Sequence, residues 1–141
     1  MLRALNGSRL PNSLEIVQIG LESETMGTDE WRKEKRRYFH DNAKEVIKRF
    51  SRTVKYDIGG FLFDLQCGEN VRMPDARPMR NIASGAYELR VRDADGIYRV
   101  FYYLKSAKGI LVFHAFTKKT QTTPQSEIEL GKHRLWEMLN Q

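Results

Sequence analysis

Apolar and polar residues alternate along two neighbouring stretches in the second half of the chain, Tyr87 to Arg92 and Tyr98 to Leu104. The polar tetrad Asp93-Ala94-Asp95-Gly96 separates them, and a tetrad of this kind that ends in glycine is typical of a β-hairpin. A third strand is predicted from Ile110 to Phe116, after Lys108-Gly109. Because successive side chains of a strand point to opposite faces, the pattern predicts a sheet with one apolar face and one basic face.

The basic face combines cations with aromatic rings. Leu89 and Val91 mark the apolar face of the first strand, whereas Arg99 of the second strand shares its face with Phe101 and Tyr103. Such a surface suits a phosphate backbone with stacked bases. The alternative is a solvated outer face whose arginines only keep a sheet edge soluble. The cations expected to converge near one end of the sheet are Arg90, Arg92, Arg99, Lys118 and Lys119.

The rest of the chain shows mainly helical periodicity. Apolar residues that recur every three or four positions predict two helices before the hairpin and one after it. The short run LEIVQI alternates and predicts a strand that precedes the helices. The predicted elements are a strand from Leu14 to Ile19, a long helix from about Glu30 to Ser51 capped by Thr28 or Asp29, a helix from Asp57 to Gln66 stopped by Gly68, a loop from Glu69 to Gly85, and a final helix from Pro124 to about Leu139.

These elements predict an α+β fold in a single domain. We expect a small antiparallel sheet of about four strands, with Leu14 to Ile19 at an edge, the two N-terminal helices packed on one face, and a C-terminal helix. Residues 1–13 are expected to form a flexible lead-in to a domain that spans residues 14–141. No apolar run approaches the ~20 residues that a membrane span needs, and the N-terminus lacks the apolar core of a secretory signal. A cytoplasmic protein is therefore expected.

The charge of the chain is polarised. The net charge is +6, yet residues 32–55 carry ten basic and three acidic residues, and residues 72–119 carry ten basic and four acidic residues. Such a distribution favours a specific anionic partner, although a charged helix face is more often simply solvated. The single cysteine, Cys67, rules out an internal disulfide and a cysteine-cluster zinc site, and we interpret it as a buried small hydrophobe.

Several motifs in the second half of the chain carry a family resemblance. DARPM begins at Asp75, YELR at Tyr87, YRVFY at Tyr98, HAFTKK at His114 and TPQSEIE at Thr123. In this order and at these separations, they resemble the HigB branch of the RelE toxin superfamily, including its phage-derived members, from type II toxin–antitoxin modules. The resemblance is close from Asp75 to Arg134, whereas the first thirteen residues and the long basic first helix are less typical.

The resemblance implies a microbial-ribonuclease-like fold and an endoribonuclease that cuts messenger RNA, in most members on the translating ribosome. Family members use the ribose 2′-hydroxyl as nucleophile and need no metal or other cofactor. Arg99 in YRVFY matches the family's active-centre arginine, Arg90 matches a basic position on the preceding strand, and Lys118 or Lys119 matches the basic end of the last core strand. The catalytic residues are thus expected to be Arg99, Arg90 and Lys119, and the substrate-binding residues Arg92, Lys118, Tyr98, Tyr87 and His114.

The resemblance also implies partners. A toxin that attacks RNA must be held inactive in its own cell, so we expect a hetero-oligomer with a helix-turn-helix, HigA-like antitoxin, besides messenger RNA and the ribosome as targets.

Two features depart from the family pattern or limit what it implies. Glu88 stands where some relatives carry a lysine, so a catalytic base formed by paired lysines cannot be carried over. His114 has a free pKa near neutrality, but its apolar strand favours a satisfied core or sheet-face histidine over a general base. Two other functions stay open, namely a module that binds nucleic acid without cutting it and a phage-derived adaptor.

Overall fold

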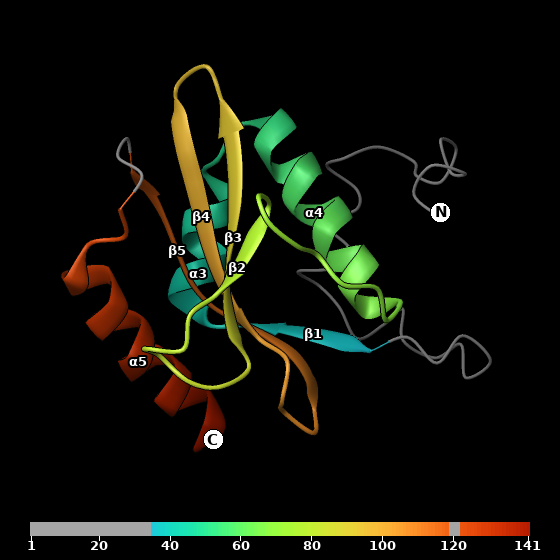
Figure 1. The fold of residues 1–141 in the computed structure, drawn as a ribbon, viewed down its shortest axis with the longest axis vertical. Coiled ribbons are helices and arrows are strands. Elements are labelled where there is room, and N and C mark those ends of the chain that lie inside the picture. Colours follow the sequence, from blue (N-terminus) through green and yellow to red (C-terminus); the bar gives the residue numbers. More distant parts are fainter. Residues whose placement is uncertain (1–34, 119–121) are drawn as a thin grey trace.

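The computed structural model describes residues 35–118 and 122–141, which form a five-stranded mixed sheet with helices packed against it (Figure 1). The strand order is β1-β5-β4-β3-β2, in which β1 runs parallel to β5 and every other neighbouring pair is antiparallel. The α+β class predicted from the sequence is confirmed. The elements are β1 (Arg36–Phe39), α3 (Asp41–Lys48), α4 (Arg52–Gln66), β2 (Ala76–Pro78), β3 (Ala86–Asp93), β4 (Gly96–Tyr103), β5 (Gly109–Lys118) and α5 (Gln125–Leu139).

The hairpin formed by β3 and β4 is where the sequence placed it. Asp93 pairs with Gly96, and the Asp93 Oδ1 atom accepts hydrogen bonds from the backbone N–H groups of Asp95, at 2.7 Å, and Gly96, at 3.2 Å. An aspartate that binds the backbone of its own turn in this way holds the turn closed. The predicted third strand and C-terminal helix are also confirmed as β5 and α5, with β5 extended at both ends.

The long first helix predicted from Glu30 to Ser51 is confirmed over Asp41–Lys48 and is wrong over Arg36–Phe39. Residues 36–39 form strand β1, and α3 begins only after His40, whose Nδ1 atom accepts from the Asn42 N–H at 3.2 Å. Pairing with β5 satisfies the backbone of this stretch and overrides its helical pattern. The pairing depends on Gly109, which has φ +145° and where a Cβ atom would lie 2.3 Å from the Arg36 carbonyl oxygen. The predicted strand Leu14 to Ile19 and the cap at Thr28 or Asp29 lie outside the described residues.

The second helix is longer than predicted and the loop after it is less irregular. Helix α4 starts at Arg52 after Ser51, whose Oγ accepts from the Val54 N–H at 3.3 Å, and it ends before Gly68, which has φ +89°. The predicted loop Glu69 to Gly85 contains β2, which pairs with β3. Cys67 is exposed at the end of α4, so the interpretation of a buried cysteine is wrong.

Two apolar cores lie on opposite faces of the sheet. The helices α3 and α4 cover one face, where Ile47, Ile58 and Leu62 pack against Leu89 and Val100. The predicted packing of both N-terminal helices on one face is thus confirmed for the described residues. Helix α5 covers part of the other face with Ile128, Leu135 and Met138, which pack against Phe101 and Phe113.

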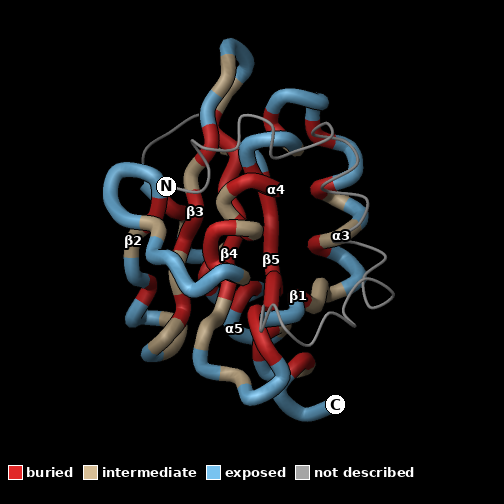
Figure 2. Tube along the Cα trace, turned by 90° about the vertical axis from the view of Figure 1, so that its right-hand side faces the viewer, coloured by how far each residue is buried: buried red, intermediate tan, exposed pale blue. Residues whose placement is uncertain are grey.

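Burial is greatest in the centre of the sheet. Figure 2 shows the buried residues concentrated along β4 and β5, and exposed ones at the turns. Among the described residues, no helix is both long and apolar enough to span a membrane.

Candidate functional site

The strand register places four of the predicted cations on one face of the sheet. Arg90 on β3 lies directly across from Arg99 on β4, and two residues further along Arg92, Ile97 and Lys118 form the next row across β3, β4 and β5. Cross-strand partners share a face, so the convergence inferred from alternation is correct for these four residues. Lys119, the fifth predicted cation, lies outside the described residues.

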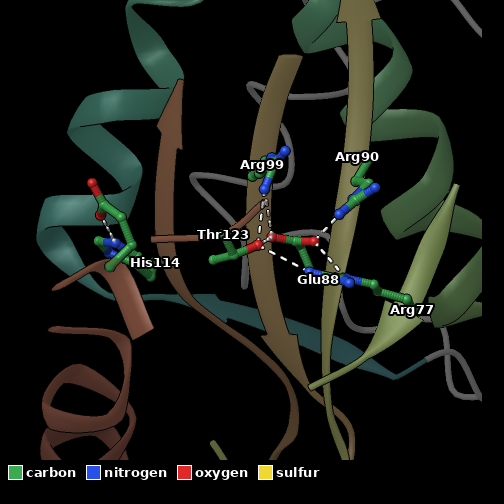
Figure 3. Close-up of polar contacts among 7 residues, drawn as sticks. Arg77, Glu88, Arg90, Arg99, His114 and Thr123 are labelled. Atoms are coloured by element: carbon green, nitrogen blue, oxygen red, sulfur yellow. Dashed lines mark hydrogen bonds and ion pairs between the residues drawn. The ribbon is translucent and has the colours of Figure 1, made fainter. Parts of the chain in front are cut away.

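A buried carboxylate organises this face. The Oε1 atom of Glu88 accepts hydrogen bonds from the Nε atoms of Arg77, at 3.0 Å, and Arg90, at 2.9 Å. Its Oε2 atom accepts from the Oγ1–H group of Thr123 at 2.5 Å, and Arg99 Nη1 lies 3.5 Å from the same oxygen. Figure 3 shows the side chains converging on Glu88 from separate segments of the chain. We call Arg77, Arg90 and Arg99 around Glu88 the arginine cluster.

Thr123 connects the arginine cluster to the segment that leads into α5. Besides donating to Glu88, its Oγ1 atom accepts from Arg99 Nη1 at 2.8 Å and from Arg77 Nη2 at 3.1 Å. A guanidinium group can only donate, so the single hydroxyl proton of Thr123 points to the carboxylate. The hydroxyl therefore fixes two arginines and the glutamate at once, and Thr123 is itself buried.

The members of the arginine cluster differ in their access to solvent. The exposed fraction of the side chain is 36% for Arg77 and 14% for Arg90, but 0% for Arg99 and for Glu88. An anion that approaches from solvent therefore meets Arg77 and Arg90 first, with the charge of Arg99 behind them. Three guanidinium groups share one carboxylate here, so positive charge dominates the cluster.

Glu88 stays ionised despite its burial. Burial by itself raises the pKa of a carboxyl group, but the hydrogen bonds from Thr123 and Arg90 and the charges of Arg99 and Arg77 outweigh it. The pKa of Glu88 is therefore below its ordinary value. The carboxylate remains a fixed negative charge at neutral pH.

His114 lies on the same face as the arginine cluster but belongs to a separate network. Its Nδ1 atom lies 2.8 Å from Arg134 Nη1, and its Nε2 atom lies 2.6 Å from Glu127 Oε1. Because arginine only donates, Nδ1 accepts and Nε2 carries the proton that is donated to Glu127. Burial lowers the pKa of His114, although Glu127 opposes this. The histidine is thus neutral and links β5 to α5, as the interpretation of a satisfied sheet-face histidine requires.

The two tyrosines predicted to bind substrate lie on the opposite face of the sheet. Tyr98 contacts Phe50 edge to face, with ring centroids 4.9 Å apart, and Tyr87 stacks on Tyr102 with centroids 5.5 Å apart. Both rings pack with the core under α3 and α4. The structure therefore does not bring Tyr87 and Tyr98 together with the arginine cluster, and the sheet itself separates them.

Sequence reasoning missed Arg77 and Thr123, and it placed Glu88 on the face of Arg90 and Arg92 but assigned it no role there. Arg77 stood in a segment predicted to be a loop, and Thr123 stood in the motif that begins the last helix. The one available signal was the parity of Glu88, an isolated acid on the face of Arg90 and Arg92. In the described ranges, no three His, Cys, Asp or Glu side chains are grouped closely enough to hold a metal ion.

The chain matches a known protein family. The family described as phage-derived protein Gp49-like matches residues 45–136, which is more than half of the chain and includes the arginine cluster, Thr123 and His114. A search of curated proteins finds no match.

Proposed function

Because the chain belongs to the phage-derived Gp49-like protein family, which is related to RelE- and HigB-type toxins, we propose that it is the toxin of a type II toxin–antitoxin module of the HigB kind. On this proposal the protein is an endoribonuclease that cuts messenger RNA, on the translating ribosome. The observation that carries the proposal is the arginine cluster, in which three guanidinium groups share one carboxylate on one sheet face.

The cluster suits a reaction in which charge develops on a phosphate. The ribose 2′-hydroxyl loses its proton as it attacks the adjacent phosphorus, and the 5′-oxygen of the next nucleotide leaves and takes up a proton. The product is a 2′,3′-cyclic phosphate. Negative charge grows on the non-bridging oxygens during this step, and fixed cations stabilise it. Guanidinium groups offer paired donors that match the geometry of phosphate oxygens.

Exposure and register support the roles proposed for the described residues. Arg90, which is partly exposed, contacts the scissile phosphate directly. Arg99 lies directly across from Arg90, and its buried charge stabilises the same phosphate from beneath. Lys119 completes the proposed catalytic set, while Arg92 and Lys118 bind the flanking phosphates. The exposed position of Arg92 and the partial exposure of Lys118, one row further along the same face, support that assignment.

The test is cleavage of a translated messenger RNA in a reconstituted translation system, with and without ribosomes. Arg90→Ala should lower the cleavage rate by ~10²- to 10³-fold, as the loss of one donor to a developing oxyanion does. Lys132→Ala is the matched control, because it removes one positive charge from an exposed position on α5. A folded Arg90→Ala protein that cuts at the parental rate would contradict the proposal.

The proposed partner is a helix-turn-helix, HigA-like antitoxin that covers the basic face or blocks its access to the ribosome. Electrostatic complementarity between an acidic antitoxin surface and this face would give fast association. Co-expression with a helix-turn-helix gene adjacent to this one should yield a stable complex and restore growth. Two purified proteins that never associate would count against this partner.

A second function is favoured by one specific observation. Arg99 is fully buried and both ring nitrogens of His114 are occupied, an arrangement that would serve a module that binds RNA without cutting it. The product distinguishes the two functions, since the toxin leaves a 2′,3′-cyclic phosphate and the binding module leaves the RNA intact. A phage-derived adaptor is a third possibility. Its function would be kept when the arginines of the cluster are replaced.

A further inference from the structure

Glu88 is the carboxylate on which the arginine cluster converges. Four donors from four segments reach its two oxygens, namely Arg77 on β2, Arg90 on β3, Arg99 on β4 and Thr123 before α5. An ionised carboxylate offers about four acceptor positions, so these contacts use its capacity. Figure 3 shows that Glu88 lies between the arginines rather than at their margin.

The arginines need such an anion to remain together. Arg90 and Arg99 are direct cross-strand partners, and like charges in that position repel. Arg99 is also fully buried, where an unpaired charge would be very costly. The Glu88 carboxylate offsets both effects, and its lowered pKa keeps it charged at neutral pH.

Thr123 adds direction to this arrangement. Arg77 binds Glu88 through Nε and Thr123 through Nη2, at 3.0 and 3.1 Å, so two separate contacts fix the plane of its guanidinium group. Neither contact uses the Nη1 atom of Arg77. The same hydroxyl holds Nη1 of Arg99 at 2.8 Å. A side chain of the same size without the hydroxyl would leave every charge in place but remove this orientation.

We infer that Glu88 and Thr123 are positioning residues, which orient Arg77, Arg90 and Arg99 for a phosphodiester and, in the case of Glu88, limit how tightly RNA binds. The inference rests on the proposed function and goes beyond it, since it gives the acidic residue of the face two opposing effects. The negative charge of Glu88 repels the RNA backbone, while its hydrogen bonds hold the arginines in the geometry that turnover requires. Removing the charge should therefore strengthen binding and slow the reaction.

The experiment measures binding and turnover separately for Glu88→Gln, Thr123→Val and Thr123→Ser. Binding is measured with an RNA oligonucleotide that carries a 2′-deoxy nucleotide at the cleavage position and so cannot be cut. Turnover is measured as kcat on the all-ribose oligonucleotide or, if ribosomes are required, on the translated messenger. Thermal unfolding and near-ultraviolet circular dichroism give the folded fraction of each variant.

Glu88→Gln should bind the deoxy-substituted RNA several-fold more tightly and with a steeper dependence on salt, because one repulsive charge is gone. Its kcat should fall by ~10- to 100-fold, the loss typical of a residue that orients a functional group. Thr123→Val should lower kcat by ~10-fold with little change in binding, since it removes orientation but no charge. Thr123→Ser should restore the parental kcat.

Each contrary outcome overturns the inference. A folded Glu88→Gln protein that binds RNA no better than the parent would show that the charge of Glu88 does not weaken RNA binding. If kcat and affinity only track the folded fraction, Glu88 and Thr123 are purely structural. If Glu88→Gln does not fold, Thr123→Val decides, because it keeps every charge of the cluster, and unchanged turnover then refutes the inference.

The same experiment tests the proposed function separately from the inference about Glu88 and Thr123. If the parental protein binds the RNA but never cuts it, the nuclease proposal is refuted. The binding of Glu88→Gln then still decides the electrostatic part of the inference, since tighter binding supports it and unchanged binding refutes it.

Discussion

Replacing Arg99 by alanine should lower stability and activity together, because its guanidinium group is both buried and central to the arginine cluster. Its side chain is 0% exposed, and Nη1 donates to Thr123 at 2.8 Å. A surface arginine would behave differently, since substitutions at exposed positions usually change the free energy of unfolding by no more than about 0.5 kcal/mol.

The expected loss of stability can be worked out from the contacts. A hydrogen bond that involves a charged group contributes roughly 1.5–3 kcal/mol, and the contact with Thr123 is one of these. As a hydrogen bond the Glu88 contact, at 3.5 Å, adds little, and Glu88 acts on Arg99 mainly through its charge. Glu88 keeps the guanidinium groups of Arg77 and Arg90, so the full cost of about 3–5 kcal/mol for a broken buried ion pair does not apply. We therefore expect Arg99→Ala to decrease the free energy of unfolding by about 2–4 kcal/mol.

The assay is urea unfolding followed by far-ultraviolet circular dichroism, with Arg92→Ala as the matched control. Arg92 lies on the same face, one row from Arg90, and is exposed. At a temperature where both variants are folded, RNA cleavage by Arg99→Ala should fall by ~10²- to 10³-fold. Equal unfolding free energies for Arg99→Ala and Arg92→Ala would refute the reasoning from burial, and parental cleavage by folded Arg99→Ala would remove Arg99 from the site.

Three further predictions concern the elements that frame the site. The folded protein holds the pKa of His114 below its ordinary value, so the unfolded chain binds more protons as the pH falls through about 6.5, and the free energy of unfolding should decrease there. His114→Gln should show a shallower decrease in urea titrations at several pH values, and an identical pH dependence would exclude His114 as the cause. Gly131→Ala should lower the unfolding free energy by ~1 kcal/mol in the same titration, because its Cβ atom would lie 2.9 Å from the buried Phe101 ring; a stabilised variant would show that the ring can move away. Gly109→Ala should cost ~2 kcal/mol or more, since its backbone is strained for other residues and its Cβ atom would meet the Arg36 carbonyl, and hydrogen exchange should then be fastest in β1; unchanged protection of β1 would contradict this.

Elements with a local signal could be predicted from the sequence. The hairpin has its turn residues, Asp93 to Gly96, between two alternating runs, and α5 follows Pro124 with an apolar pattern of its own. The two strands that were missed have no such signal. β1 pairs with Gly109, more than seventy residues away along the chain, and β2 has three residues and ends in Pro78. Their formation is decided by partners that a local pattern does not contain.

The sequence could predict which residues of the candidate site share a sheet face, but not which of them are exposed to solvent. Strand parity placed Arg90, Arg92, Arg99 and Lys118 together, and this is correct. Parity could not show that Arg99 is buried or that it contacts Thr123, which lies 24 residues further along the chain. The catalytic and substrate-binding roles assigned to these residues stay predictions, which the variants above test.

The arginine cluster is poorly explained by stability alone. Replacing a buried ion pair by apolar residues of similar size is often neutral or stabilising, because desolvation of the charges cancels much of their attraction. Here three guanidinium groups share a single buried carboxylate, and two of them keep exposed side-chain surface. A core built only for stability would have used the apolar packing found beside the cluster on the same face, where Phe101 contacts Phe113 and Phe116. The excess of positive charge at the solvent side of the cluster is what an anionic ligand requires, and Glu88 explains how that excess can be held in the folded chain without the ligand.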